Sequence, residues 1–206
     1  MQNKSKTIWW VAGIILLIVF LLVLGHFTSA KPVITITNSN TLPGIIKGDT
    51  PWSANNGALR ARLKDIGLPP LTREGSALHI HQHIDIFING KPISVPAGIG
   101  IDQIAGFISP IHTHRANGVV HVESPTVQTF TLGQFFDVWG VRFTAQCIGG
   151  YCASASTSIK VYANGKLYKG NPRLLPFKER QEIFIDYGSK TATTTVPSSY
   201  AFAPGY

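Results

Sequence analysis

Residues 78–96 have the sequence LHIHQHIDIFINGKPISVP, and this stretch decides the fold. In an extended strand alternate side chains lie on one face, so Ile80, Ile84 and Ile86 point together into a core. The opposite face of the same strand then carries His79, His81, His83 and Asp85. This pattern predicts a long strand over residues 78–88 with one apolar face and one face of potential metal ligands.

Three Asn-Gly dipeptides predict three β-hairpins. Both central residues of a type I′ turn need a positive φ, which asparagine and glycine adopt most easily. The dipeptides are Asn89-Gly90, Asn117-Gly118 and Asn164-Gly165, and alternating apolar residues flank each of them. Residues 182–187 alternate in the same way and predict a final strand.

One helix signal interrupts these strands. Thr131 and Gln134 have the spacing of a capping box, and Gly140 provides a stop after an aromatic-rich segment. We therefore expect a mainly β (α+β) domain, an antiparallel sheet of hairpins with one short helix. A β-grasp-like arrangement and a small sandwich both fit this order of elements.

A second histidine segment lies on both sides of Asn117-Gly118. If these two residues form the turn, His114 lies opposite His121, and His112 lies opposite Glu123 on the same face. Three imidazoles and one carboxylate would then converge on one patch of the sheet. That set of donors suits a first-row metal ion, with copper or zinc preferred.

The two histidine segments together contain six of the seven histidines of the chain. We expect strand 78–88 to lie beside the 112–123 hairpin, or to pack across from it, with its histidines on the same surface. Pooled ligands would then allow one or two ions, with Asp85 and Glu123 as bridging or orienting carboxylates. Alternatively, the histidines are structural or respond to pH without any metal.

The N-terminus has the pattern of a membrane anchor. Residues 1–6 contain two lysines, and residues 7–27 are almost entirely apolar, long enough to span a bilayer. The lysines predict a cytoplasmic N-terminus and an extracytoplasmic domain. A cleaved signal peptide ending near Thr28-Ser29-Ala30 is the alternative.

The rest of the chain divides by composition. Residues 28–76 are rich in proline, asparagine, serine and glycine and predict a stalk or linker, with a short helix near 58–66. Residues 77–188 form the predicted histidine-rich β domain, and residues 189–206 a flexible tail. In an exported domain Cys147 and Cys152 most simply form a disulfide, and a thiolate pair that binds metal is the alternative.

The net charge of +8 does not predict a nucleic-acid partner. The basic residues are scattered along the chain, and no aromatic-basic recognition motif is present. The sequence therefore predicts a membrane-anchored, extracytoplasmic protein that binds copper or zinc. A metal-dependent enzyme is the alternative, either zinc hydrolase or lyase-like with Glu123 as a possible base, or copper-dependent and oxygen-activating. A cell-surface interaction module with structural histidines is the third hypothesis.

Overall fold

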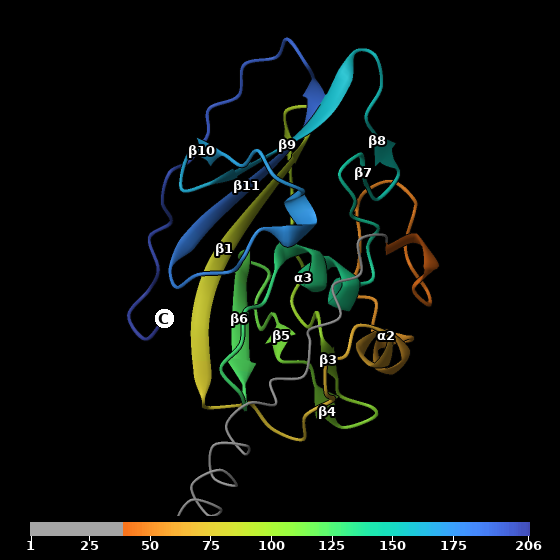
Figure 1. Cartoon of the computed structure of the whole chain (residues 1–206), viewed down its shortest axis with the longest axis vertical. Coiled ribbons are helices and arrows are strands. Elements are labelled where there is room, and N and C mark those ends of the chain that lie inside the picture. Colours follow the sequence, from red (N-terminus) through yellow and green to blue (C-terminus); the bar gives the residue numbers. More distant parts are fainter. Residues whose placement is uncertain (1–38) are drawn as a thin grey trace, which may run out of the picture. The chain divides into compact units, whose positions relative to one another are not determined.

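The computed structural model describes residues 39–206, and their main feature is a seven-stranded β-sheet (Figure 1). Its hydrogen-bonded order is β10-β9-β11-β1-β6-β5, and β2 also pairs with β1. The strands are β1 (Leu78–Ile88), β2 (Lys91–Ile93), β5 (Ile111–His112), β6 (Val119–Ser124), β9 (Thr157–Ala163), β10 (Lys166–Leu167) and β11 (Gln181–Ser189). The predicted mainly β character is confirmed for this part of the chain.

Strand β1 lies inside the sheet and follows the predicted alternation. Ile84, Ile86 and Ile88 are buried in the hydrophobic core, and the strand turns back into β2 after them. The turn residues Asn89 and Gly90 have φ angles of 50° and 77°, as a type I′ turn requires. Both the strand over 78–88 and its hairpin are therefore confirmed.

The sequence predicts an antiparallel sheet, but the observed sheet is mixed. Strand β1 pairs with the last strand, β11, in parallel, and with β6 in antiparallel orientation. Parallel neighbours need a long crossover rather than a hairpin, and the chain between β1 and β11 supplies one. The described residues form one large sheet and two two-stranded ribbons, so the small sandwich is wrong.

Helix α3 (Leu132–Trp139) packs its aromatic side chains into the core, and every residue of the helix is buried. Thr131 and Gln134 form the predicted capping box, and Gly140 ends the helix with a φ of 80°. The buried guanidinium of Arg62 donates to the last-turn carbonyls of Asp137 at 2.8 Å and Val138 at 3.1 Å. Arg62 thus satisfies carbonyl groups that the end of a helix leaves unpaired.

Residues 39–76 pack onto the domain instead of forming a linker. They contain a 3₁₀ turn, η1 (Ser39–Thr41), and the expected short helix, α2 (Leu59–Asp65). The hydrophobic side chains that they bury in the core are those of Leu42, Trp52, Leu59, Leu63, Ile66 and Leu68. The prolines of this segment therefore lie in a packed chain, whereas the sequence predicts a stalk or linker with some packed pieces over 28–76.

The remaining elements are short. Two ribbons pair β3 (Ile101–Asp102) with β4 (Phe107–Ile108), and β7 (Cys147–Ile148) with β8 (Tyr151–Cys152). Cys147 and Cys152 form the predicted disulfide across the second ribbon. The 3₁₀ turn η2 (Pro172–Leu174) holds Arg173, whose guanidinium forms a buried ion pair with Asp137 at 2.7 Å.

The predicted membrane anchor, residues 7–27, lies outside the described residues. Between residues 39 and 206 none of the helices has the length and apolar character needed to cross a bilayer.

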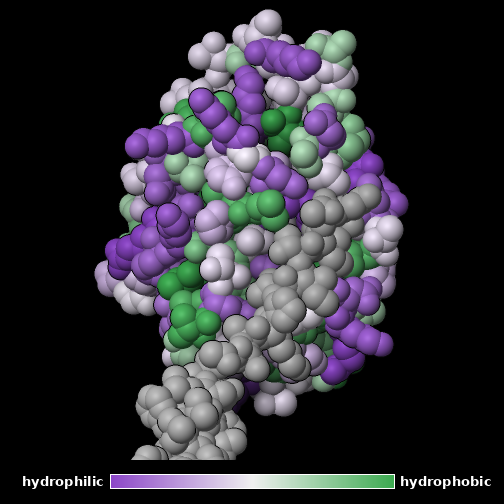
Figure 2. All heavy atoms as spheres, in the orientation of Figure 1, coloured by the Kyte–Doolittle hydropathy of each residue, from purple (hydrophilic) through white to green (hydrophobic). Residues whose placement is uncertain are grey.

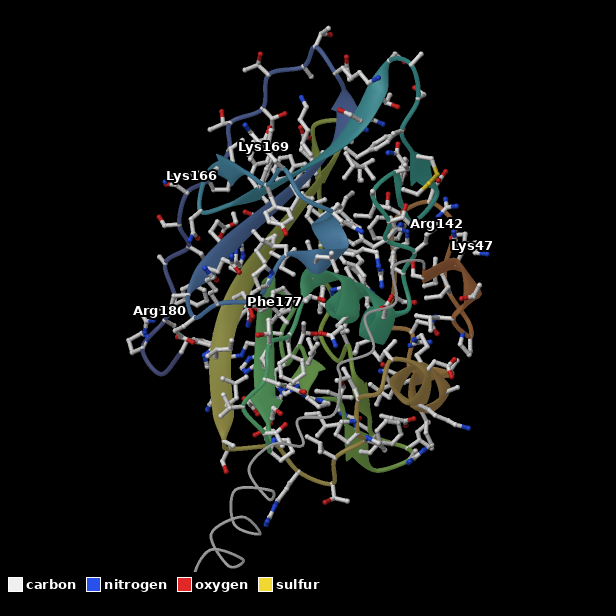
Figure 3. All side chains as sticks on the ribbon, viewed as in Figure 1. Lys47, Arg142, Lys166, Lys169, Phe177 and Arg180 are labelled. Carbon is white, nitrogen blue, oxygen red and sulfur yellow. A yellow bond between two sulfur atoms is a disulfide. The ribbon has the colours of Figure 1, made fainter. Side chains whose placement is uncertain are left out.

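The surface of the described part is mixed in character. Figure 2 shows hydrophobic side chains in small groups among hydrophilic ones on the face drawn. In Figure 3, Lys47 and Arg142 lie at one side of the molecule, and Lys166 and Lys169 lie at the other. These labelled basic side chains are spread apart, in line with their scattered positions in the sequence.

Candidate metal centre

Three neighbouring strands bring the two histidine segments together. Strand β1 pairs with β6 so that His79 lies opposite Glu123 and His81 opposite His121. Strand β5 pairs with the other edge of β6 and places His112 opposite His121. The ring centroids of His81 and His121, one from each segment, are 4.6 Å apart. The predicted adjacency of strand 78–88 and the 112–123 segment is therefore confirmed.

The register of the second segment differs from the prediction by two residues. His112, rather than His114, lies opposite His121, so a six-residue loop over 113–118 replaces the expected two-residue turn. Long-range bonds at Thr113 explain the difference: its hydroxyl donates to the Pro96 carbonyl at 2.7 Å and accepts from the Ile99 amide at 3.1 Å. These bonds end β5 before it can extend to the Asn-Gly pair.

Loop 113–118 is also attached to β1. The Gly118 carbonyl accepts from the Ile84 amide at 2.9 Å, and the Asn117 carbonyl lies 3.0 Å from Nε2 of His83. Gly118 has a φ of 77°, and a Cβ at this position would come within 2.7 Å of the His83 ring. The glycine is therefore required by close packing as well as by backbone conformation.

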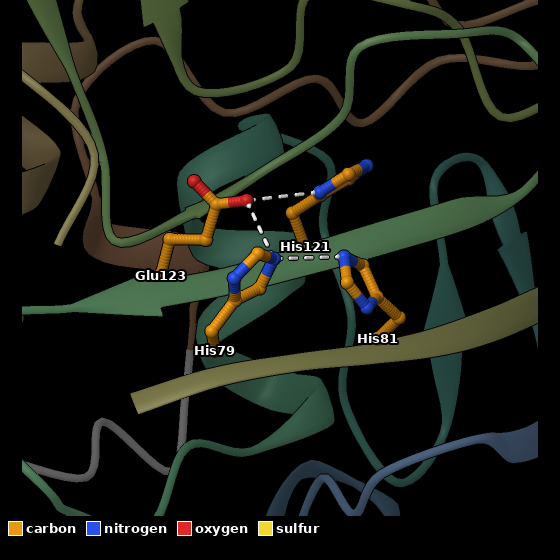
Figure 4. Close-up of side chains that lie close together, drawn as sticks. All are labelled: His79, His81, His121 and Glu123. Atoms are coloured by element: carbon orange, nitrogen blue, oxygen red, sulfur yellow. Dashed lines mark hydrogen bonds and ion pairs between the residues drawn. The ribbon is translucent and has the colours of Figure 1, made fainter. Parts of the chain in front are cut away.

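The first group of donors consists of His79, His81, His121 and Glu123 (Figure 4). Oε1 of Glu123 lies 3.2 Å from Nε2 of His79 and 3.2 Å from Nδ1 of His121. Nε2 of His79 lies 3.2 Å from Nε2 of His81. The side chains thus converge from the adjacent strands β1 and β6. Glu123 contacts His79 on β1 and His121 on β6.

The second group consists of His112, His114, His121 and Glu123. Nε2 of His112 lies 3.1 Å from Nε2 of His114 and 3.8 Å from Oε2 of Glu123. Nδ1 of His112 lies 3.0 Å from the carbonyl oxygen of Ser109, which orients the ring with Nε2 toward the group. A carbonyl partner on the second nitrogen is the usual support for a metal-binding histidine.

The donor separations match those of a tetrahedral site. Zinc binds imidazole nitrogen at about 2.0–2.1 Å, which places two tetrahedral ligands about 3.3 Å apart. The closest donor pairs here are 3.1–3.2 Å apart. The closest pairs therefore have nearly the spacing that one ion would impose, and all donors of each group lie within 4.8 Å of one another.

The electrostatics favour the protonation states that metals bind. Burial, together with the imidazoles of His121 and His79, lowers the pKa of His81 to about 4. Burial lowers the pKa of His112 to about 4 as well. Although burial alone would raise it, the hydrogen bond to His121 and the nearby imidazoles lower the pKa of Glu123 to about 2. At neutral pH these residues provide neutral imidazoles and an ionised carboxylate.

His83 and Asp85, also predicted as ligands, are grouped with Glu182 instead of with the other histidines. Nδ1 of His83 lies 2.8 Å from Oε2 of Glu182, whose pKa is raised by burial, and Nε2 lies beside the Asn117 carbonyl. Both ring nitrogens therefore have protein partners. This arrangement holds loop 113–118 against the sheet, which indirectly positions His114.

Sequence reasoning missed four residues near the histidines. Glu74 lies 3.2 Å from Nε2 of His114, and Glu179 accepts from the backbone amide of His81 at 3.0 Å. The ring of Tyr200 stacks on His83 with a centroid distance of 3.7 Å, and that of Tyr206 lies 5.0 Å from the His81 ring. The only signal in the sequence was the presence of aromatic residues in an otherwise small, polar tail.

The C-terminal segment therefore lies against the histidines, whereas a flexible tail had been predicted for 189–206. The Tyr206 carbonyl accepts from Arg180, and the Thr194 hydroxyl donates to Asp186 at 3.1 Å. Figure 3 shows Arg180 beside this end of the chain. Hydrogen bonds and ring stacking hold the segment, although it contains no helix or strand after Ser189.

No protein-family model matches this chain, and neither the curated proteins nor the solved structures contain a significant match to it.

Proposed function

We propose that this chain is an exported, membrane-anchored protein whose β domain binds copper or zinc. The proposed ligands are His79, His81, His112, His114, His121 and Glu123. The observation that carries the proposal is that five imidazoles and one carboxylate form two overlapping groups, in which the closest donor atoms are 3.1–3.2 Å apart. His83 and Asp85 are left out, because they are grouped with Glu182 and not with the other histidines, and both nitrogens of His83 have partners outside the two groups.

The donor types support copper(II) and zinc over other ions. Imidazole nitrogen suits both ions, and affinity alone favours copper(II). Both cysteines of the chain are in the disulfide, and its single methionine is Met1. A thiolate or thioether set of the kind that selects copper(I) is therefore not part of the proposal.

Export and anchoring are supported by the sequence and by the disulfide. Residues 8–27 are apolar apart from His26 and follow two lysines, and disulfides persist mainly in oxidising compartments. Membrane fractionation, with protease added to cells from which any outer membrane has been removed, tests this part. Loss of the β domain to external protease would agree with the proposal, and complete protection would contradict it.

Metal binding is tested by elemental analysis. The full-length protein, purified in detergent, is incubated with copper or zinc, dialysed and analysed. We expect metal in the wild-type protein and a large loss in His121→Ala, because His121 belongs to both groups. His26→Ala is the matched control, since His26 lies in the N-terminal apolar stretch. A metal content in the wild type no higher than in the final dialysis buffer would contradict the proposal.

A second candidate is catalysis by the bound metal. The side chains of His79 and His114 are 54% and 39% exposed, so each group has an edge that solvent reaches. An open position there would allow a metal-bound water to act as nucleophile. Zinc-loaded protein is assayed for CO₂ hydration and ester hydrolysis, and copper-loaded protein for oxygen consumption with a reductant. Rates equal to those of metal-free protein would reject this candidate.

A further inference from the structure

We propose that the two groups hold two metal ions at once, and that the ions share His121 and Glu123. The inference rests on the proposed metal binding and goes beyond it, because one ion would satisfy the proposed function. The first ion would lie with His79 and His81, and the second with His112 and His114. The two histidine pairs come from opposite neighbours of strand β6, which carries both shared residues.

His121 has the position of a bridging residue. Its ring lies between the two histidine pairs, with centroid distances of 4.6 Å to His81, 4.6 Å to His114 and 5.3 Å to His112. An imidazole has two nitrogens on opposite sides of the ring, so one residue can bind two ions if its N–H proton is released. Two adjacent cations favour that release, because they stabilise the imidazolate anion.

Glu123 provides an independent observation. Its Oε1 atom faces His79 and His121, whereas its Oε2 atom is directed at the second group, 3.8 Å from Nε2 of His112. The side chain is only 6% exposed, and within residues 39–206 Oε2 is buried without a hydrogen-bond partner. A buried carboxylate oxygen without a donor is unfavourable, and a cation next to it would remove that cost.

Each group also has its own outer carboxylate. Glu74 lies 3.2 Å from Nε2 of His114, and Glu179 accepts from the amide of His81. One shared carboxylate alone would leave two divalent ions with a large uncompensated charge. Acidic side chains on both sides reduce this charge, and they are placed one to each histidine pair.

The competing arrangement is a single ion that is bound by only one of the two groups. It would occupy His121 and Glu123 together with one histidine pair, and the other pair would remain without an ion. Two ions instead use both nitrogens of His121 and both oxygens of Glu123. The two arrangements differ in stoichiometry and in magnetism, and both properties can be measured with copper(II).

The test combines elemental analysis with electron paramagnetic resonance of copper(II)-loaded, full-length protein. We expect two copper ions per chain and a signal much weaker than two independent coppers give, because bridging ligands couple the unpaired electrons. His79→Ala and His114→Ala each change a partly exposed side chain, so the fold should survive. Each variant should lose one copper and gain the full signal of an isolated ion. His26→Ala should behave as wild type.

Other results would overturn the inference. Two coppers with the full signal of two isolated ions would mean separate sites without a bridge. One copper per chain in the wild type would leave metal binding intact and reject the paired centre. If neither single variant folds, the wild-type stoichiometry and signal still decide the question. A wild-type protein without copper would instead reject the proposed function itself, and this inference with it.

Discussion

His81 on strand β1 and His121 on strand β6 lie directly opposite each other, with ring centroids 4.6 Å apart and ring planes at 86°. The two residues are forty positions apart in the sequence and belong to different histidine segments. Two charged imidazoles so close together would repel, so this pairing disfavours a charge on both rings at once unless a cation replaces their protons.

Metal should stabilise the fold measurably. An ion that binds only the native state, present at one hundred times its dissociation constant, raises the free energy of unfolding by about 2.7 kcal/mol. For a domain of this size, this raises the melting temperature by roughly 5–10 °C. We expect a chelator to lower the melting temperature of the isolated protein, and added copper or zinc to restore it. Melting that is the same with chelator and with metal would favour the third hypothesis, in which the histidines are purely structural.

The metal-free protein should lose stability as the pH falls from about 6.5 to 4. His81 and His112 have a pKa near 6.5 when unfolded and about 4 when folded, so the unfolded state binds more protons in this interval. For the fully buried His112 the loss reaches about 3 kcal/mol at pH 4. Glu123, whose pKa is lowered to about 2, adds its own loss only below pH 4.5.

Urea denaturation at several pH values measures this dependence. The variant His112→Gln has no titrating group at that position, so its stability should fall less steeply between pH 6.5 and 4. Equal slopes for the variant and the wild type would contradict the prediction. The comparison of slopes is informative even if the variant is less stable at every pH.

The strands and their turns could be predicted because their signals are local. The period-two pattern of β1, the Asn-Gly turns at 89–90 and 164–165, and the capping box of α3 each depend on residues within a few positions. Asn164 and Gly165 have φ angles of 49° and 77°, as the turn chemistry requires. The shared face of the β1 histidines follows from the same alternation.

The remaining features depend on contacts between distant residues. Thr113 is bonded to residues 96–99, which ends β5 early and moves the register of the second segment. Glu74 and Glu179 reach the histidines from loops, and their identity as acidic residues gave no indication of that placement. Tyr206 meets the site only because the chain folds back after β11. Such contacts cannot be derived from periodicity.

Gly118 should be more sensitive to substitution than other glycines with similar backbone angles. Gly118→Ala would place a Cβ 2.7 Å from both the His83 ring and the Ile84 carbonyl, with φ at 77°. Gly106 has a φ of 65° but no heavy atom within 4 Å of the added Cβ, so Gly106→Ala is the matched control. We expect backbone strain to lower the free energy of unfolding by about 1–2 kcal/mol in both variants. In Gly118→Ala, overpacking should lower it by about 1–3 kcal/mol more.

The Gly118 substitution should also weaken metal binding, because it displaces the loop that carries His114. Urea denaturation gives the difference in stability, and copper titration of the two folded variants gives the difference in affinity. Equal stability losses in the two variants would mean that loop 113–118 adapts freely to the added methyl group.

The C-terminal segment should slow the exchange of bound metal. The Tyr206 ring lies 5.0 Å from His81 and 5.6 Å from His121, and Arg180 holds the backbone carbonyl of the same residue. Removing the ring in Tyr206→Ala opens this side of the first group to solvent. We therefore expect a chelator to remove metal several-fold faster from this variant, measured by stopped-flow absorbance, with a smaller change in equilibrium affinity.

Tyr206→Phe separates two explanations for that effect. It keeps the aromatic ring and removes only the hydroxyl group, so it should release metal at the wild-type rate if the ring acts as a cover. A loss of affinity in Tyr206→Phe as large as in Tyr206→Ala would instead identify the hydroxyl as a ligand. Unchanged release from Tyr206→Ala would mean that the segment does not restrict access, and that its contacts with the histidines serve only to hold the chain on the domain.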